Sequence, residues 1–99
     1  MIIDRKFKAR FDKEMGPASF ALFMKVARTS LGVTQDIFGK KLGISRASVC
    51  GIEKGRHLVS PGLAVRVARK AGLLEKLALQ YCLQDQVRQA GSKYTVQVT

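Results

Sequence analysis

The chain contains 99 residues, of which 46% are hydrophobic, and its 18 Lys and Arg against 7 Asp and Glu give a formal net charge of +11. This length allows a single domain over residues 1–99 and excludes two independent cores. Such a charge excess favours an anionic partner, either nucleic acid or an acidic membrane surface, over a generically basic protein.

No segment has the pattern of an export signal, a membrane span or a metal site. The opening "MIIDRKFK" places apolar residues before charges, the reverse of a signal peptide. Cys50 and Cys82 lack the CxxC or Cys/His spacing of metal ligands. The basic residues are spread along the chain rather than gathered on one amphipathic helix. We therefore expect a cytoplasmic, bacterial or phage-encoded protein with no membrane association, cofactor or metal ion.

The first regular pattern lies at residues 2–12, where apolar and charged residues alternate from Ile3 to Phe11 with an interruption at Arg5. Alternation with a period of two predicts a half-buried strand with a basic outer face. A flexible basic arm is the alternative interpretation of residues 1–15.

Three helices are predicted next. Beyond Gly16-Pro17, apolar residues recur at helical spacing until Gly32 and form the stripe of an amphipathic helix. The segment "QDIFGKKL" follows as a second helix with Thr34 as its cap. A glycine turn then leads to a third helix, which Ser45 caps and Gly55 ends. Two short helices joined in this way form a helix-turn-helix.

Two more helices and a strand complete the chain. A fourth helix begins at Pro61, which the helix start favours, and stops at Gly72. The fifth helix, roughly residues 74–90, has apolar residues on two nearly opposite faces. In "KYTVQVT", residues 93–99, Tyr94, Val96 and Val98 alternate with polar residues and predict a strand.

Residues 17–72 resemble the Cro and phage-repressor type of helix-turn-helix, also called the xenobiotic-response-element family. The most specific part is "VTQDIFGKKLGISRASVCGIEKG". It has that family's spacing: Thr-Gln opens one helix, Leu-Gly ends it, a serine caps the next helix and Glu-x-Gly ends that one. We therefore expect a mainly α fold, a five-helix repressor-like helix-turn-helix domain with short N- and C-terminal β-strands that pair.

The resemblance implies that the two short helices bind DNA. Gln35 matches a position that holds a DNA phosphate, and a helix N-terminus attracts such an anion. Arg46 and Ala47 match residues that reach base edges in the major groove. Arginine can bind guanine with two hydrogen bonds, although Arg46 could instead hold a phosphate. The residues expected at the DNA are Thr34, Gln35, Ser45, Arg46, Ala47, Ser48, Cys50, Gly51, Lys54 and Arg56.

Gly51 is unusual because a mid-helix glycine costs about 1 kcal/mol relative to alanine. Since Val49 and Ile52 take the inward side, Gly51 is expected to lie outward, towards the DNA, at a position where family members often carry a base-reading side chain. Its lack of a side chain would let the backbone approach closely and shift base discrimination onto Arg46 and Ala47 at the start of the helix. We expect Gly51→Ala to stabilise the fold and to weaken operator binding, and we interpret His57 as a polar loop residue.

The resemblance also concerns helix packing. Arg28 and Glu53 match the positions of a buried or half-buried ion pair that links the first and third helices in family members. Gly39 replaces the usual alanine where the two short helices approach each other. A glycine still meets the need for a small side chain there, although it weakens the second helix.

The sequence therefore predicts a sequence-specific double-stranded DNA-binding transcriptional regulator, a dimeric repressor that reads the major groove with the helix at residues 45–54. Residues 73–99 are expected to form a homodimer through Leu79, Leu83, Val87 and the terminal strands. The alternative is an antitoxin or adaptor that binds another protein and regulates its own expression through the helix-turn-helix. An enzyme is not expected, because the single histidine lies in a loop and the acidic residues are few and dispersed.

Overall fold

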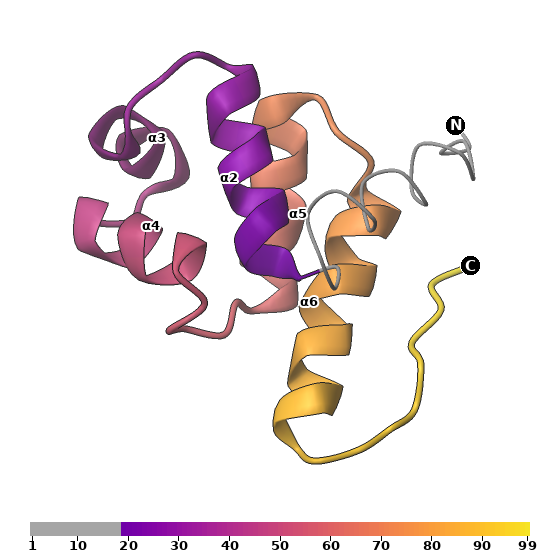
Figure 1. Ribbon diagram of the computed structural model, residues 1–99. Coiled ribbons are helices and arrows are strands. Elements are labelled where there is room, and N and C mark those ends of the chain that lie inside the picture. The colour runs from indigo at the N-terminus through magenta and orange to yellow at the C-terminus, as the bar shows by residue number, and fades with distance from the viewer. Residues whose placement is uncertain (1–18) are drawn as a thin grey trace.

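The computed structural model describes residues 19–99, in which the chain forms five α-helices. Their bounds are α2 Phe20–Ser30, α3 Gln35–Leu42, α4 Arg46–Glu53, α5 Pro61–Ala71 and α6 Glu75–Gln89. All five helices that the sequence predicts are present. The short helices α3 and α4 lie on one side of α2, and α6 lies on the other side (Figure 1). None of these helices is long and apolar enough to cross a membrane.

Local capping sets where four of the helices begin. In each case a serine or threonine side chain accepts a hydrogen bond from the backbone N–H three residues further on, which satisfies one of the unpaired donors of the first turn. These capping residues are Ser19, Thr34, Ser45 and Ser60. Gly43 ends α3 in the left-handed conformation, with φ of 77°. The predicted caps at Thr34, Ser45 and Ser60 agree with the observed ones because these signals involve near neighbours only. The first helix begins later than the predicted boundary at Gly16-Pro17, because Ser19 caps it.

The core lies between α2 and the other four helices. Phe20, Phe23, Met24 and Ala27 of the predicted stripe are at most 3% exposed, whereas its last predicted member, Leu31, lies beyond the end of α2 and is 37% exposed. Val49 and Ile52 of α4 also lie in the core. The buried apolar side chains are Phe20, Phe23, Met24, Ala27, Phe38, Leu42, Val49, Ile52, Val59, Ala64, Val67, Ala68, Ala78, Tyr81 and Cys82. The two short helices are therefore fixed to the scaffold by their inward faces.

The predicted C-terminal strand is wrong: residues 19–99 contain no strand. A strand needs the backbone of a neighbouring strand, but here the side chain of Gln84 on α6 takes that place. Its amide nitrogen donates to the carbonyl oxygen of Tyr94 at 3.0 Å, and its oxygen accepts from the N–H of Val96 at 2.7 Å. Tyr94, which was expected on the apolar side of a strand, is 82% exposed. The predicted strand at residues 2–12 lies outside the described residues. The fold is therefore mainly α without the predicted C-terminal strand.

Candidate nucleic-acid interface

The turn between α3 and α4 packs directly against α3 at Gly39. The N–H of Ile44 donates to the carbonyl oxygen of Gly39 at 2.9 Å. A Cβ atom placed on Gly39 would lie 2.7 Å from the carbonyl oxygen of Ile44. The family resemblance implied only that position 39 needs a small side chain. The structure requires glycine there, because even the methyl group of alanine would push the turn away. Gly39 therefore sets how closely α4 follows α3.

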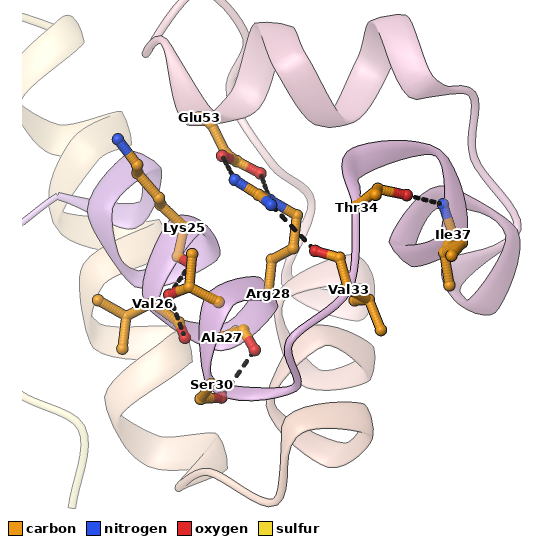
Figure 2. Close-up of polar contacts among 10 residues, drawn as sticks. Lys25, Val26, Ala27, Arg28, Ser30, Val33, Thr34, Ile37 and Glu53 are labelled. Atoms are coloured by element: carbon orange, nitrogen blue, oxygen red, sulfur yellow. Dashed lines mark hydrogen bonds and ion pairs between the residues drawn. The ribbon is translucent and has the colours of Figure 1, made fainter.

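An ion pair holds α4 against α2, as predicted. The Nε and Nη2 atoms of Arg28 lie 2.8 and 3.1 Å from the two carboxylate oxygens of Glu53 (Figure 2). The Nη1 atom donates to the carbonyl oxygen of Val33 at 3.0 Å. The hydrogen bonds to Glu53 raise the pKa of the Arg28 guanidinium, so this group remains charged. Arg28 therefore fixes both α4 and the connection that leads into α3.

The N-termini of α3 and α4 open onto one hollow. It has a volume of about 470 Å³ and is lined by Arg28, Thr34, Gln35, Asp36 and Arg46. Three of the predicted site residues, one from α4 and two from the start of α3, therefore meet at this surface. The hollow exposes the first turns of two helices, where unpaired N–H groups and the positive ends of the helix dipoles favour an anion.

The first turn of α4 is capped by serine hydroxyls. The Ser45 hydroxyl accepts from the N–H of Ser48 at 3.0 Å and donates to the Ser48 hydroxyl oxygen at 2.9 Å. This pairing engages both serine hydroxyls within the helix cap. Arg46 and Ala47 follow with exposed side chains. The structure thus presents one cation and one methyl group at the start of α4.

Two curated proteins are similar to about half of this chain. An uncharacterized HTH-type transcriptional regulator of Methanothermobacter thermautotrophicus is 40% identical over 45 residues, which cover 46% of this chain and 65% of that protein. A second one, from Methanocaldococcus jannaschii, is 38% identical over 50 residues, which cover 50% of this chain and 76% of that protein. The chain belongs to the HTH-type transcriptional regulators.

Neither relative's name specifies the Cro and phage-repressor type. No model of a protein family and no solved structure matches the chain. Transcriptional regulators are not typically enzymes, in agreement with the expectation of a non-catalytic protein. Within residues 19–99 of this regulator, no group of three or more His, Cys, Asp and Glu side chains could hold a metal ion.

Exposed basic side chains lie at both ends of α4. Every acidic side chain between residues 19 and 99 forms an ion pair with a basic one. These pairs are Asp36–Lys40, Glu53–Arg28, Glu75–Arg69 and Asp85–Arg88. Arg46, Lys54 and Arg56 are exposed and pair with none of these four carboxylates. Lys54 and Arg56 come after α4 and do not line the hollow. The cations therefore flank α4 at both ends.

The expected orientation of Gly51 is wrong in one respect. Gly51 does lie on the opposite side of α4 from Val49, as helical spacing requires, but it is buried rather than open to solvent. The imidazole of His57 covers it. The loop after α4 folds back over this part of the helix, and the spacing of α4 alone contains no sign of that contact.

The sequence did not indicate two further contacts, of Asp36 at the hollow and of Arg66 at the C-terminal end of α3. Asp36 lines the hollow and brings a carboxylate, 3.4 Å from Lys40, to a surface that otherwise favours anions. Arg66 of α5 donates to the carbonyl oxygen of Leu42 at 2.9 Å and so satisfies an end group of α3. The position of Asp36 in the first turn of α3 was visible in the sequence. Nothing local indicates the contact of Arg66, since its partner is 24 residues away.

Proposed function

We propose that this regulator is a homodimeric repressor of the Cro and phage-repressor type, which binds a specific double-stranded DNA sequence by inserting α4 into the major groove. The observation that carries the proposal is the position of Arg46, exposed on the first turn of α4 and in one hollow with Thr34 and Gln35. In this arrangement the N-terminus of α3 would hold a backbone phosphate while Arg46 reaches a base edge.

Each part of the proposed interface has a separate role. Arg46 would bind guanine through two hydrogen bonds, and the methyl group of Ala47 would contact a thymine methyl. Gln35 and the Thr34 cap would hold a phosphate, as would the cations Lys54 and Arg56 beyond the other end of α4. The remaining members of the interface are Ser45, Ser48 and Cys50. Gly51 is left out as a direct contact because the His57 ring covers it.

Selection of bound sequences from random double-stranded DNA at fixed salt tests the proposal. The wild type should enrich one sequence motif, and Arg46→Ala should lose the preference at one base pair, at a cost of about 1–3 kcal/mol in binding. Arg46→Lys should keep the charge without restoring that preference, because lysine lacks the two-pronged donor geometry. Lys70→Ala, which removes an exposed charge from α5, is the control. A wild type that binds random DNA as tightly as any selected sequence would exclude the proposal.

The proposed dimer uses the second apolar face of α6. Leu79, Leu83 and Val87 share this face and are half-buried, so less apolar surface is available to a second subunit than fully exposed side chains would provide. A twofold dimer would place two copies of α4 about one turn of DNA apart, which suits a palindromic operator. In sedimentation equilibrium the wild type should be a dimer, and Leu83→Glu should shift it to a monomer that binds the operator more weakly. A monomeric wild type would exclude the dimer.

A further inference from the structure

The side of α4 that faces away from the core lacks a side chain at Gly51. Successive residues of a helix are about 100° apart. Gly51 therefore lies close to the direction of Ala47, one turn earlier, and away from Val49. The proposed mode of binding turns this side of α4 towards the DNA. Any other residue at position 51 would place a side chain on that surface, whereas glycine has none to contact the DNA.

The imidazole of His57 fills the space that a side chain at position 51 would occupy. A Cβ atom built on Gly51 would lie 2.1 Å from Cδ2 and 2.4 Å from Nε2 of the His57 ring. These distances are far shorter than any non-bonded contact, so the ring and a Cβ atom exclude each other. Gly51 is buried for this reason, although it lies on the outer side of the helix.

The loop that carries His57 is anchored at both ends. On one side Gly55, with φ of 74°, turns the chain, and the N–H of Arg56 donates to the carbonyl oxygen of Gly51 at 2.8 Å. On the other side Val59 is 5% exposed, and its carbonyl oxygen accepts from Cys82 Sγ at 2.9 Å. Because few residues separate the two anchors, the backbone of His57 is held beside α4, and its ring lies against Gly51.

The ring also has an unused polar edge. His57 is exposed, and neither of its nitrogens forms a hydrogen bond within residues 19–99. The Cδ2–Nε2 edge faces Gly51, so the opposite corner of the five-membered ring, Nδ1, points away from α4. A neutral imidazole has one donor and one acceptor nitrogen. This corner can therefore make one hydrogen bond to a group outside the protein.

We propose that His57 supplies the side chain that α4 lacks at position 51 and contacts a base edge in the major groove. This inference rests on the proposed function, because the outer side of α4 meets DNA only if that helix enters the groove. His57 is then a residue that determines specificity, although it lies beyond the end of the helix that reads the DNA. Gly51 is required because any larger residue would displace the ring.

Sequence selection with two single variants and their combination tests this role. His57→Ala should lose the preference at one base pair of the selected motif and bind that motif about 2- to 10-fold more weakly, the size of one hydrogen bond. Gly51→Ala should change the preference at the same base pair, since its methyl group displaces the ring. The double variant should change it no further. Leu58→Ala, which alters the next loop residue, 51% exposed, is the matched control and should keep the wild-type motif.

Three outcomes would overturn the inference. Unchanged preferences in His57→Ala would show that the ring does not contact a base. An equal loss of affinity for all sequences, with a smaller salt dependence, would assign His57 to a phosphate instead. Independent effects of the two substitutions would show that Gly51 does not act through His57. A wild type without any sequence preference would instead exclude the proposed function, so the two failures are distinguishable. Thermal unfolding of each variant verifies that it is folded.

Discussion

Arg28 and Glu53 join α2 to α4 through two parallel hydrogen bonds of 2.8 and 3.1 Å. The same guanidinium donates to the carbonyl oxygen of Val33, just before α3 begins. One side chain thus connects the scaffold with both helices of the proposed interface. Because the side chains of Arg28 and Glu53 are only 17% and 5% exposed, the loss of either partner leaves the other in a poorly solvated place.

We expect Arg28→Ala to lower the free energy of unfolding by about 3 kcal/mol, because the Glu53 carboxylate would lose its partner while remaining buried. Lys40→Ala is the control, since it removes a pair with Asp36 whose side chains are 77% and 57% exposed. That change should cost less than about 1 kcal/mol. Urea denaturation at pH 7 measures both. Equal losses would mean that the Arg28 pair contributes no more than a surface pair.

Gly39→Ala and Gly51→Ala should differ, although both substitutions raise helix propensity by about 1 kcal/mol. At Gly39 the new methyl group meets the backbone oxygen of Ile44 at 2.7 Å, and the turn must move. At Gly51 it meets the exposed ring of His57, which can swing away. We expect Gly39→Ala to destabilise by about 1–3 kcal/mol and Gly51→Ala to stabilise by less than about 1 kcal/mol. Thermal unfolding compares the two, and a more stable Gly39→Ala would contradict this account.

The stability should depend on pH through Asp85, which accepts from the N–H of Phe20 at 2.9 Å. Burial raises the pKa of the Asp85 carboxyl, against smaller opposing effects of that hydrogen bond and of Arg88. A folded-state pKa above the unfolded value means that the folded protein takes up the proton first as the pH falls. Ionisation of Asp85 therefore lowers the stability of the fold at neutral pH relative to the protonated carboxyl, and this cost disappears as the pH falls through the folded-state pKa.

Asp85→Asn checks the sign, because asparagine keeps an acceptor for Phe20 without the charge. Relative to this variant, the wild type should become more stable between pH 7 and about pH 4, the range in which an aspartate with a raised pKa gains its proton. Urea denaturation of both proteins across this range measures the difference in their free energies of unfolding. The titration of the other groups, which both proteins share, cancels in this difference. A relative stability that falls as the pH is lowered would contradict the prediction.

Gln84→Leu should free the C-terminal segment without unfolding the protein. The substitution removes the hydrogen bonds of the Gln84 amide with Tyr94 and Val96, which lie outside the apolar core. We expect the amide of Val96 to exchange with solvent faster, while the amides of the core helices keep their protection. Hydrogen exchange measured by NMR follows each amide separately. Unchanged exchange at Val96 would mean that other contacts hold this segment.

Lys54→Ala should weaken DNA binding equally for all sequences. Lys54 is exposed at the end of α4 and pairs with no acidic side chain between residues 19 and 99. If it holds a phosphate, the slope of log K against log salt should decrease by about one. Fluorescence anisotropy over a salt series measures this slope. A change in sequence preference would instead indicate a base contact.

Local patterns determined the helices of this protein. The apolar stripe of α2 has a period of 3.6 residues, and the caps at Thr34 and Ser45 act over three residues, so each signal is complete within one short segment. The Arg28–Glu53 pair was implied by a resemblance between sequences rather than by any local rule. The structure confirms the pair, because the packing of α4 against α2 brings the Arg28 guanidinium to the Glu53 carboxylate.

The tertiary structure alone decided what happens beside Gly51 and at the C-terminus. The loop anchored at Val59 brings His57 back onto α4, and the amide of Gln84 takes the backbone partners that a strand would have used. An alternating pattern specifies which side chains could share a face, but whether a neighbouring strand exists depends on the rest of the fold. Likewise, helical spacing determined on which side of α4 Gly51 lies, while a residue outside that helix determined what covers it.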